Sequence, residues 1–258
     1  RHQRIAGRVL PGWGEWCSQV RTWSIRYDPV RPEFFAQETV HPYAFARRLS
    51  ELLPSNAVIV SDCGGNVVTM NHAFRTKRGQ RYFSSNGNSP MGFALAGAIG
   101  AWYADPSRPV VCVIGDGGLS INIQELQTLA HYDIPVKVFV LNNGCYGITR
   151  QYQQTNFAGR CLASGPDGYS SPDLRKIADA YEIPHYEVTK ASDMFHLGDV
   201  AKPSLCIVNC PSFATYEPRL IGWATPIEDL DPKLPREELR DNLIGVEPLP
   251  GWETGEYK

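Results

Sequence analysis

The chain has 258 residues, of which 43% are hydrophobic and 20% are charged, and its formal net charge is −2. This composition is typical of a soluble globular protein of one or two domains, and the near-neutral charge excludes an extended basic surface for nucleic acid or membrane lipids. The sequence has no apolar run near the roughly 20 residues that cross a membrane. Its seven cysteines are scattered and odd in number, which indicates reduced thiols and a cytoplasmic location.

In chain order, the first segment is residues 1–35, where Trp13, Trp16 and Trp23 stand among Gly, Pro and Arg with little periodicity. We expect an irregular linker or the end of a preceding central domain, and Arg1, which is not a natural start, favours the second interpretation. The chain then alternates between helical and strand-like patterns. Helices are predicted at residues 42–53, 66–74, 91–103, 119–131 and 173–181, and strands at residues 57–61, 109–114, 136–141, 185–188 and 205–208.

Strands that alternate with helices of about 10–15 residues indicate βαβ units and a mostly parallel sheet. The runs VVCVI and VKVFVL are continuously apolar, as expected for parallel strands that are buried on both faces. We therefore predict an α/β fold with three layers, αβα, over residues 36–215. Residues 216–258 are rich in Pro, Glu and Asp, and we expect them to form an extended C-terminal arm.

The strand predicted at residues 109–114 ends in Gly115-Asp116-Gly117-Gly118, directly before a helix. Ligands of open parallel sheets bind beyond such strand ends. Glycines let a ligand approach the backbone and a helix N-terminus favours an anion, whereas Asp116 repels an anion unless a divalent cation lies between them. The pattern matches neither the Rossmann nor the P-loop fingerprint. A tight turn with a helix-capping Asp is the alternative interpretation.

The next strand ends in Asn142-Asn143-Gly144-Cys145-Tyr146-Gly147. Two Asn and two Gly are typical of a turn, but an Asn oxygen is also a suitable ligand for Mg²⁺, which takes about six oxygens. Asp116, Asn143, a backbone carbonyl, phosphate oxygens and water would complete such a set. Because adjacent parallel strands end side by side, the two motifs together predict a Mg²⁺–phosphate site.

These motifs and the 118–141 interval between them resemble the signature of thiamine diphosphate (ThDP)-dependent enzymes. The segment GDGGLSINIQELQTLAHYDIPVKVFVLNNGCYG is similar to the acetolactate synthase version, and so are SSNGNSPMGFALAGAIGAWYADPSRPVV upstream and SPDLRKIADAYEIP downstream. The resemblance covers residues 35–215 and corresponds to the C-terminal diphosphate-binding (PP) domain of the acetolactate synthase-like family. It argues against the turn-only interpretation of the combined pattern.

The resemblance implies roles for individual residues. Asp116 and Asn143 match the side-chain ligands of Mg²⁺, and Cys145 matches the residue that offers its backbone carbonyl, so that its thiol has no role. Met91 matches the apolar residue that holds ThDP in its bent shape, although a core Met at a helix start is the alternative. Ser89 matches the position whose carbonyl meets the 4'-amino group of the cofactor. The residues expected to bind the cofactor are Gly64, Gly65, Asn66, Ser89, Met91, Gly117, Gly118, Asn143, Cys145 and Gly147.

Two segments depart from the family pattern. Gly64-Gly65-Asn66 stands where the related synthases usually carry Gly-Gln-His; Asn66 can still donate a hydrogen bond to phosphate, and Gly65 offers only its N–H. Ile148 and Tyr152 stand where the synthases usually have Met and a Trp that helps to select the second keto acid. Tyr152 and the nearby Arg150 predict a different acceptor pocket, larger or more polar. Arg150 could bind a carboxylate or phosphate of a substrate, and a solvated helix face is the alternative interpretation.

ThDP chemistry requires a Glu hydrogen-bonded to N1' of the aminopyrimidine ring. In the family this Glu belongs to a pyrimidine-binding domain, usually on the partner subunit, and no such domain is recognisable in this sequence. We therefore expect a composite active site in a homo- or hetero-oligomer. Some members also hold FAD in a central domain, of which we expect at most the last stretch, near residues 1–25, in this sequence.

The leading hypothesis from sequence is a ThDP- and Mg²⁺-dependent carboligase, in which a 2-keto acid such as pyruvate is decarboxylated and the product is joined to a second carbonyl compound. One alternative is the diphosphate-binding subunit of a split 2-keto acid decarboxylase, which needs no acceptor. Another is a non-catalytic subunit that keeps the fold without the chemistry; Asp116, Asn143 and Met91 argue against it.

Overall fold

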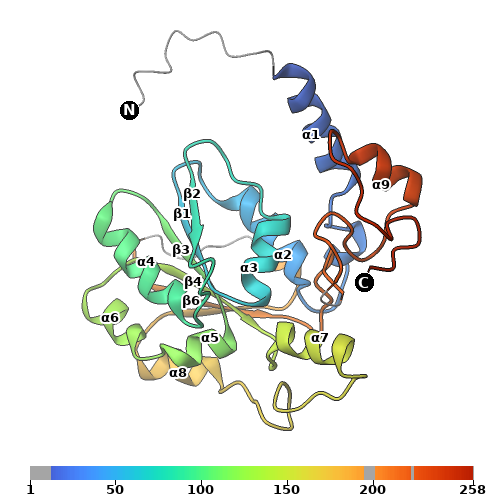
Figure 1. The fold of residues 1–258 in the computed structure, drawn as a ribbon. Coiled ribbons are helices and arrows are strands. Elements are labelled where there is room, and N and C mark those ends of the chain that lie inside the picture. The colour runs from blue at the N-terminus through green and yellow to red at the C-terminus, as the bar shows by residue number, and fades with distance from the viewer. Residues whose placement is uncertain (1–12, 195–200, 222–223, 258) are drawn as a thin grey trace.

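Six parallel strands form one central sheet in the computed structural model, which describes residues 13–194, 201–221 and 224–257 (Figure 1). The order across the sheet is β2-β1-β3-β4-β6-β5. The sheet therefore confirms the predicted parallel α/β architecture. The strands are β1 (Val58–Ser61), β2 (Arg81–Ser84), β3 (Val110–Gly115), β4 (Lys137–Asn142), β5 (His185–Val188) and β6 (Ser204–Asn209).

Helices cover both faces of the sheet and give it three layers (Figure 1). One core contains residues of α4, α5, α6 and α8, and the other contains residues of α2 and α3. Successive strand residues alternate between these cores: Val58 and Val60 of β1 belong to the first, and Ile59 belongs to the second. These helices are α2 (Pro42–Leu52), α3 (Gly65–Ala73), α4 (Phe93–Ala104), α5 (Asp116–Ile121), α6 (Glu125–His131) and α8 (Leu174–Ala180).

The helix predicted at residues 119–131 is two helices, α5 and α6, so this prediction was wrong. The break lies at Asn122, whose side chain donates a hydrogen bond of 3.0 Å to the carbonyl of Gly92. An Asn side chain that bonds to backbone favours helix ends over helix interiors. Strand β2 was also not predicted, because it lies at the sheet edge and is only partly buried.

The N-terminal segment also differs from the prediction, because α1 (Gly14–Arg26) is a regular helix; residues 1–12 lie outside the described part of the chain. No residue of α1 is buried, so its sequence carries no one-sided apolar pattern. The helix lies beside α9 (Arg236–Asn242), near the other end of the chain (Figure 1). Trp23 donates a hydrogen bond of 2.8 Å to Asn242, and Tyr27 donates one of 2.6 Å to Glu238.

The remaining helices are α7 (Gly147–Asn156) and two short 3-10 helices, η2 (Pro32–Phe35) and η3 (Ala191–Asp193). Within the described residues, no helix is long and apolar enough to cross a membrane.

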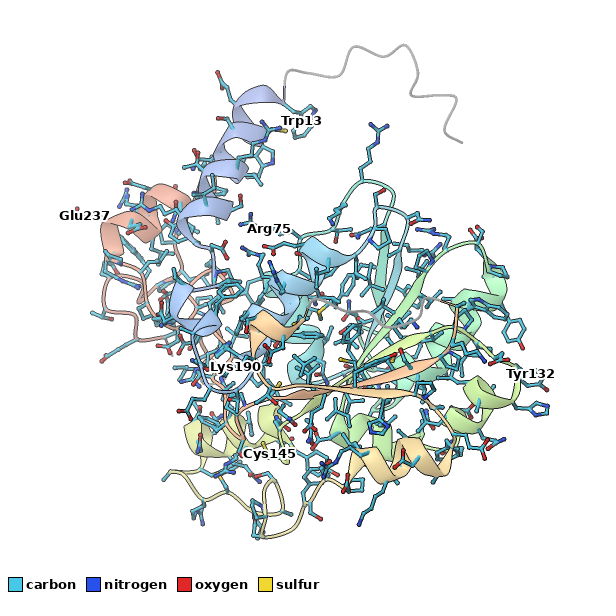
Figure 2. The ribbon with its side chains drawn as sticks, turned by 180° about the vertical axis from the view of Figure 1, so that it is seen from behind. Trp13, Arg75, Tyr132, Cys145, Lys190 and Glu237 are labelled. Atoms are coloured by element: carbon cyan, nitrogen blue, oxygen red, sulfur yellow. The ribbon has the colours of Figure 1, made fainter. Side chains whose placement is uncertain are left out.

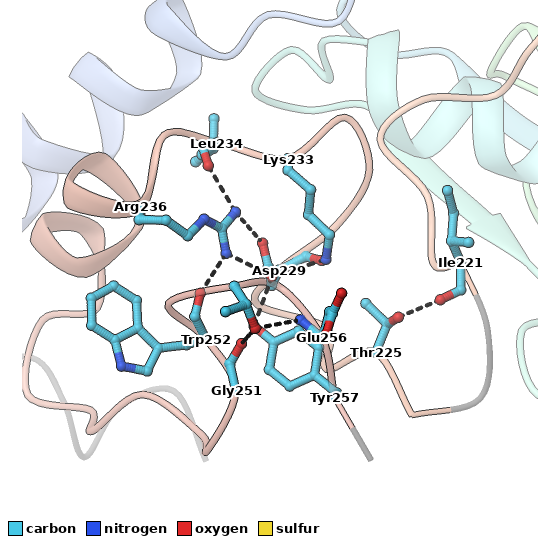
Figure 3. A network of polar contacts seen from close by, with 11 residues as sticks. Ile221, Thr225, Asp229, Lys233, Leu234, Arg236, Gly251, Trp252, Glu256 and Tyr257 are labelled. Carbon is cyan, nitrogen blue, oxygen red and sulfur yellow. Dashed lines mark hydrogen bonds and ion pairs between the residues drawn. The ribbon is translucent and has the colours of Figure 1, made fainter.

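The C-terminal segment is not simply extended, because it contains α9 and a buried polar cluster around Asp229 (Figure 3). The Asp229 side chain accepts hydrogen bonds from Arg236 at 3.0 and 3.1 Å, from Lys233 at 2.9 Å and from the hydroxyl of Tyr257 at 2.7 Å. Burial opposes ionisation of Asp229, but these donors outweigh it and lower the pKa of the carboxyl well below its usual range.

We expect Asp229→Asn to lower the free energy of unfolding by about 2–3 kcal/mol at pH 7, since each hydrogen bond to a charged group contributes about 1.5–3 kcal/mol. A carboxyl whose pKa is lowered by folding stabilises the protein above its ordinary pKa and loses that contribution as the pH falls. The difference in the free energy of unfolding between Asp229→Asn and the unaltered protein should therefore become smaller as the pH falls from about 5 to about 2. Urea unfolding at several pH values measures it.

Asp241→Asn is the matched control, because Asp241 lies on the exposed side of the same segment. It should leave the free energy of unfolding within about 0.5 kcal/mol of the unaltered value. If Asp229→Asn lowers the free energy of unfolding equally at pH 7 and pH 3, the ionised carboxylate of Asp229 is not the source of the stabilisation.

Candidate functional site

A pocket lies at the carboxyl ends of β1, β3 and β4. Parallel pairing brings these ends together, since Ser61 pairs with Val113 and Gly115 pairs with Leu141. The loops that leave the three strands line the pocket, as the sequence predicted for neighbouring parallel strands. The predicted site residues that meet in its wall are Gly64, Gly65, Asn66, Met91, Asp116, Gly117, Gly118, Asn143, Cys145, Gly147 and Ile148.

Asp116 joins two of the strand ends. It is the first residue of α5, and its side chain is 2% exposed. Its Oδ2 atom accepts a hydrogen bond of 3.0 Å from the backbone N–H of Gly144, in the loop after β4. In the same loop, Oδ1 of Asn143 accepts one of 3.2 Å from the N–H of Cys145. Burial raises the pKa of the Asp116 carboxyl, because it disfavours the charged form.

The described residues of the pocket wall include acidic side chains and no Lys or Arg. Asp62 and Asp116 both contribute to it, whereas none of the described residues that line it is Lys or Arg. A diphosphate group would be repelled by these carboxylates unless a cation lay between them. The oxygens of Asp116 and Asn143 and the carbonyl of Cys145 are the kind of ligand that Mg²⁺ takes. The residues present therefore fit a Mg²⁺–diphosphate group.

The described residues contain no group of three or more His, Cys, Asp and Glu that would hold a metal ion by itself. The single carboxylate and single amide of Asp116 and Asn143 fill only part of the octahedron of Mg²⁺. A cation at this position would therefore depend on oxygens of the ligand, so binding of metal and of ligand should be coupled.

Two glycines allow close packing along one wall of the pocket. A β-carbon at Gly117 would lie 2.7 Å from Cε1 of Tyr146 and 3.3 Å from Cε of Met91. A β-carbon at Gly118 would overlap Oδ2 of Asp62. A side chain at either position would force these neighbours to move, so glycine lets Tyr146, Met91 and Asp62 pack directly against this turn.

The loop after β1 also lines the pocket. Gly64 has a φ of 65°, in the left-handed region that favours glycine, and it precedes the first residue of α3. Asn66 donates a hydrogen bond of 3.3 Å to the carbonyl of Cys63, and its Nδ2 atom would lie 2.9 Å from a β-carbon at Gly115. Asn66 therefore spans the gap between the ends of β1 and β3.

Two predicted site residues do not line this pocket. Ser89 lies two positions before Met91 and has a φ of 44°, which is uncommon outside glycine. Tyr152 lies one turn beyond Ile148 on α7, in a neighbouring groove that Ile148 also lines and that residues of the C-terminal segment complete. The role of Ser89 and the substrate-pocket role of Ile148 and Tyr152 stay predictions.

Asp62 is a pocket residue whose role the sequence reasoning missed. Its carboxylate accepts hydrogen bonds of 3.1 Å from the backbone N–H groups of both Gly92 and Ala94, at the start of α4. Asp62 thereby fixes the segment that carries Met91 against the end of β1. A carboxyl directly after a buried strand is a visible signal, but partners 30 and 32 residues later are not.

Two tyrosines that line the pocket, Tyr146 and Tyr216, were also missed. The rings of Tyr146 and Tyr169 lie 4.3 Å apart, centre to centre. Burial, together with the nearby carboxylate of Asp116, raises the pKa of the Tyr169 hydroxyl, so this hydroxyl is protonated at neutral pH. Tyr216, from the C-terminal segment, lines the same pocket.

Burial disfavours the reactive thiolate form of the pocket cysteines Cys63 and Cys145. Burial raises the pKa of Cys63 to about 11, so its thiol is protonated at neutral pH. The Cys145 thiol donates a hydrogen bond of 2.6 Å to the carbonyl of Ser212, and burial raises its pKa as well. The thiol of Cys145, labelled in Figure 2, thus bonds to the segment that follows β6.

Residues 62–204 match the family described as thiamine pyrophosphate enzyme, C-terminal TPP binding domain; thiamine pyrophosphate is another name for ThDP. The acetolactate synthase isozyme 3 large subunit of Escherichia coli (strain K12) is 34% identical over 183 residues, which are 69% of this chain and 30% of that protein. The probable acetolactate synthase large subunit of Methanococcus aeolicus is 35% identical over 155 residues, 60% of this chain and 25% of that protein.

Acetolactate synthase 2, chloroplastic, of Brassica napus is 31% identical over 214 residues, 79% of this chain and 33% of that protein. The chain thus spans a quarter to a third of the length of these relatives. The family match covers more than half of the chain and includes the loops that line the pocket after β1, β3 and β4. The chain therefore belongs to the thiamine pyrophosphate enzyme family, as a C-terminal TPP-binding domain similar to that of acetolactate synthase large subunits.

Proposed function

We propose that this chain provides the Mg²⁺- and diphosphate-binding part of a cytoplasmic ThDP-dependent enzyme, which decarboxylates a 2-keto acid such as pyruvate and joins the product to a second carbonyl compound. One observation carries the proposal: Asp116 and Asn143 meet in a glycine-walled pocket without a Lys or Arg among its described lining residues. That arrangement suits a diphosphate only when a divalent cation accompanies it. The names of the similar proteins support carboligation, and seven unpaired cysteines support a cytoplasmic location.

In this proposal Asp116 and Asn143 hold Mg²⁺ through side-chain oxygens, and Cys145 holds it through its backbone carbonyl. The N-termini of α3 and α7, at Gly65 and Gly147, face the same pocket and favour the anionic diphosphate. ThDP, when bound, supplies the carbon centre that accepts the electron pair released on decarboxylation. Met91, which lines the pocket, would support the organic part of the cofactor.

The described pocket offers no free acid or base to this chemistry. The Asp62 carboxylate is occupied by backbone N–H groups, Asp116 is assigned to the metal, and the Cys63 thiol is protonated. A proton acceptor for ThDP therefore has to come from elsewhere. This supports the proposal of a composite site, in which a Glu of a pyrimidine-binding domain, on another segment or chain, acts on the cofactor.

The acceptor is expected to bind in the groove between α7 and the C-terminal segment. Ile148 and Tyr152 line it, with 37% and 42% of their surface exposed. Arg150, on the same helix, lines neither this groove nor the cofactor pocket within the described residues. Its guanidinium lies toward Gly165 instead, so a keto-acid carboxylate would have to be recognised by another group.

Native mass spectrometry of the assembly purified from its source tests the composite site. We expect a mass that includes ThDP, Mg²⁺ and either a second polypeptide or a longer chain. A bare homo-oligomer of this chain that neither retains nor takes up ThDP would exclude the catalytic proposal and favour a non-catalytic subunit. Product analysis with pyruvate then separates the remaining hypotheses, because a carboligase forms a hydroxyketone whereas a decarboxylase releases the aldehyde.

A further inference from the structure

The C-terminal segment inserts one side chain into the pocket. Tyr216 is 6% exposed and lines the pocket together with the loops after β1 and β4. Its hydroxyl oxygen occupies the space that a β-carbon at Gly65 would take, and it would lie 3.0 Å from a β-carbon at Gly147. The hydroxyl is therefore placed between the N-termini of α3 and α7, where an anion is favoured.

Four hydrogen bonds hold Tyr216 and its neighbour in place. The backbone N–H of Tyr216 donates to Oε1 of Gln151 at 2.9 Å, and Nε2 of Gln151 donates to the carbonyl of Tyr216 at 3.2 Å. The hydroxyl of Tyr43 donates to the carbonyl of Glu217 at 2.9 Å and accepts from the N–H of Glu217 at 3.0 Å. Because Gln151 is buried and Tyr43 belongs to the core, the segment is fixed at the point where Tyr216 enters the pocket.

The Tyr216 hydroxyl takes no part in these four hydrogen bonds. Among the described residues, none of the hydrogen bonds that the structure forms uses this oxygen, whereas the backbone of the same residue is fully bonded. Burial raises the pKa of Tyr216 far above neutrality, so the group is a neutral O–H donor. A donor without a partner among the described residues, in a pocket whose described lining contains no Lys or Arg, is suited to an anionic ligand.

Gly65 supports this interpretation. Its φ is not in the left-handed region, so the backbone does not require a glycine at this position. What requires it is the Tyr216 hydroxyl, which leaves no room for a β-carbon. The two residues thus form a matched pair, 151 positions apart in the sequence.

We propose that the Tyr216 hydroxyl donates a hydrogen bond to the diphosphate group of the cofactor. Glycine at position 65 leaves the space that this hydroxyl needs. This inference rests on the proposed ThDP site. Tyr216 then makes the start of the C-terminal segment part of the cofactor pocket. The loop after β1 would bind the diphosphate through backbone N–H groups, and Tyr216 would add a side-chain donor.

Titration calorimetry of the purified assembly that contains this chain, with ThDP in the presence of Mg²⁺ and separately with Mg²⁺ and inorganic pyrophosphate, tests the inference. Tyr216→Phe removes only the hydroxyl and should raise both dissociation constants about tenfold, the usual effect of losing a hydrogen bond to a charged group. Tyr132→Phe is the matched control, because Tyr132 is exposed and lies far from Cys145 at the pocket (Figure 2). It should change neither constant.

Two further variants separate ligand contact from packing. Gly65→Ala should weaken ThDP binding in the unaltered background, because the new methyl group displaces the Tyr216 hydroxyl. Combined with Tyr216→Ala it should cause no further loss, so the two effects are not additive. Equal affinities of Tyr216→Phe and the unaltered chain would overturn this inference alone. Failure of the unaltered assembly to bind either ThDP or pyrophosphate would overturn the proposed cofactor site and this inference with it.

Discussion

Asp116→Asn should lower the affinity for ThDP in the presence of Mg²⁺ by at least about 100-fold, because altering even a neighbour of a metal ligand costs about 10- to 100-fold in metal affinity. The substitution keeps the size of the side chain and leaves an oxygen that can accept from Gly144, 3.0 Å away. It removes the negative charge that attracts the cation. Without that charge, nothing in the described wall except Asp62 would balance a divalent ion, and Asp62 is held by the start of α4.

Stability provides the check that the variant is folded. Burial raises the pKa of Asp116, so in the absence of metal its ionised carboxyl makes folding less favourable at pH values above that pKa. An amide carries no such cost, and metal-free Asp116→Asn should unfold at the same urea concentration as the unaltered chain or a higher one. Asp105→Asn, at an exposed carboxyl beyond α4, is the matched control and should bind ThDP normally. If Asp116→Asn binds ThDP as tightly as the unaltered chain, the proposed Mg²⁺ site at Asp116 is wrong.

The fold was predictable where burial leaves a simple pattern. The continuous apolar runs of β3 and β4 predict neighbouring parallel strands, and the residues that follow them meet as expected. The pattern fails where burial is weak. Helix α1 has no buried residue, and β2 is an edge strand, so neither leaves a periodic signal. The break between α5 and α6 depends on Asn122 and a distant carbonyl, which no local window contains.

The candidate site likewise contains residues that the sequence predicts and residues that it does not. Residues that belong to the two strand-end motifs, such as Asp116 and Asn143, are close in space because the sheet topology places them together. Asp62 and Tyr216 depend instead on partners 30 or more residues away, and nothing in their immediate sequence marks them. Gly65 shows the limit most clearly: as a sequence feature it is a departure from a family pattern, and only the position of the Tyr216 hydroxyl explains it.

Gly118→Ala should lower the free energy of unfolding by roughly 2–4 kcal/mol, through overpacking and the loss of buried hydrogen bonds. Gly118 is helical and buried, and a β-carbon there would overlap Oδ2 of Asp62. That oxygen accepts the N–H of Gly92 at 3.1 Å, so moving the carboxylate uncaps α4 and leaves a buried donor unpaired. The same movement shifts the segment that carries Met91, so we also expect cofactor affinity to fall.

Gly100→Ala separates this clash from the general effect of alanine in a helix. Gly100 lies in α4, is exposed, and has no atom within 4 Å of the place of a β-carbon. Alanine there should leave stability unchanged or raise it by up to about 1 kcal/mol, because alanine favours the helix more than glycine does. Urea unfolding followed by circular dichroism compares the two. Equal midpoints for Gly118→Ala and Gly100→Ala would show that Asp62 moves without cost and that its two hydrogen bonds do not fix the start of α4.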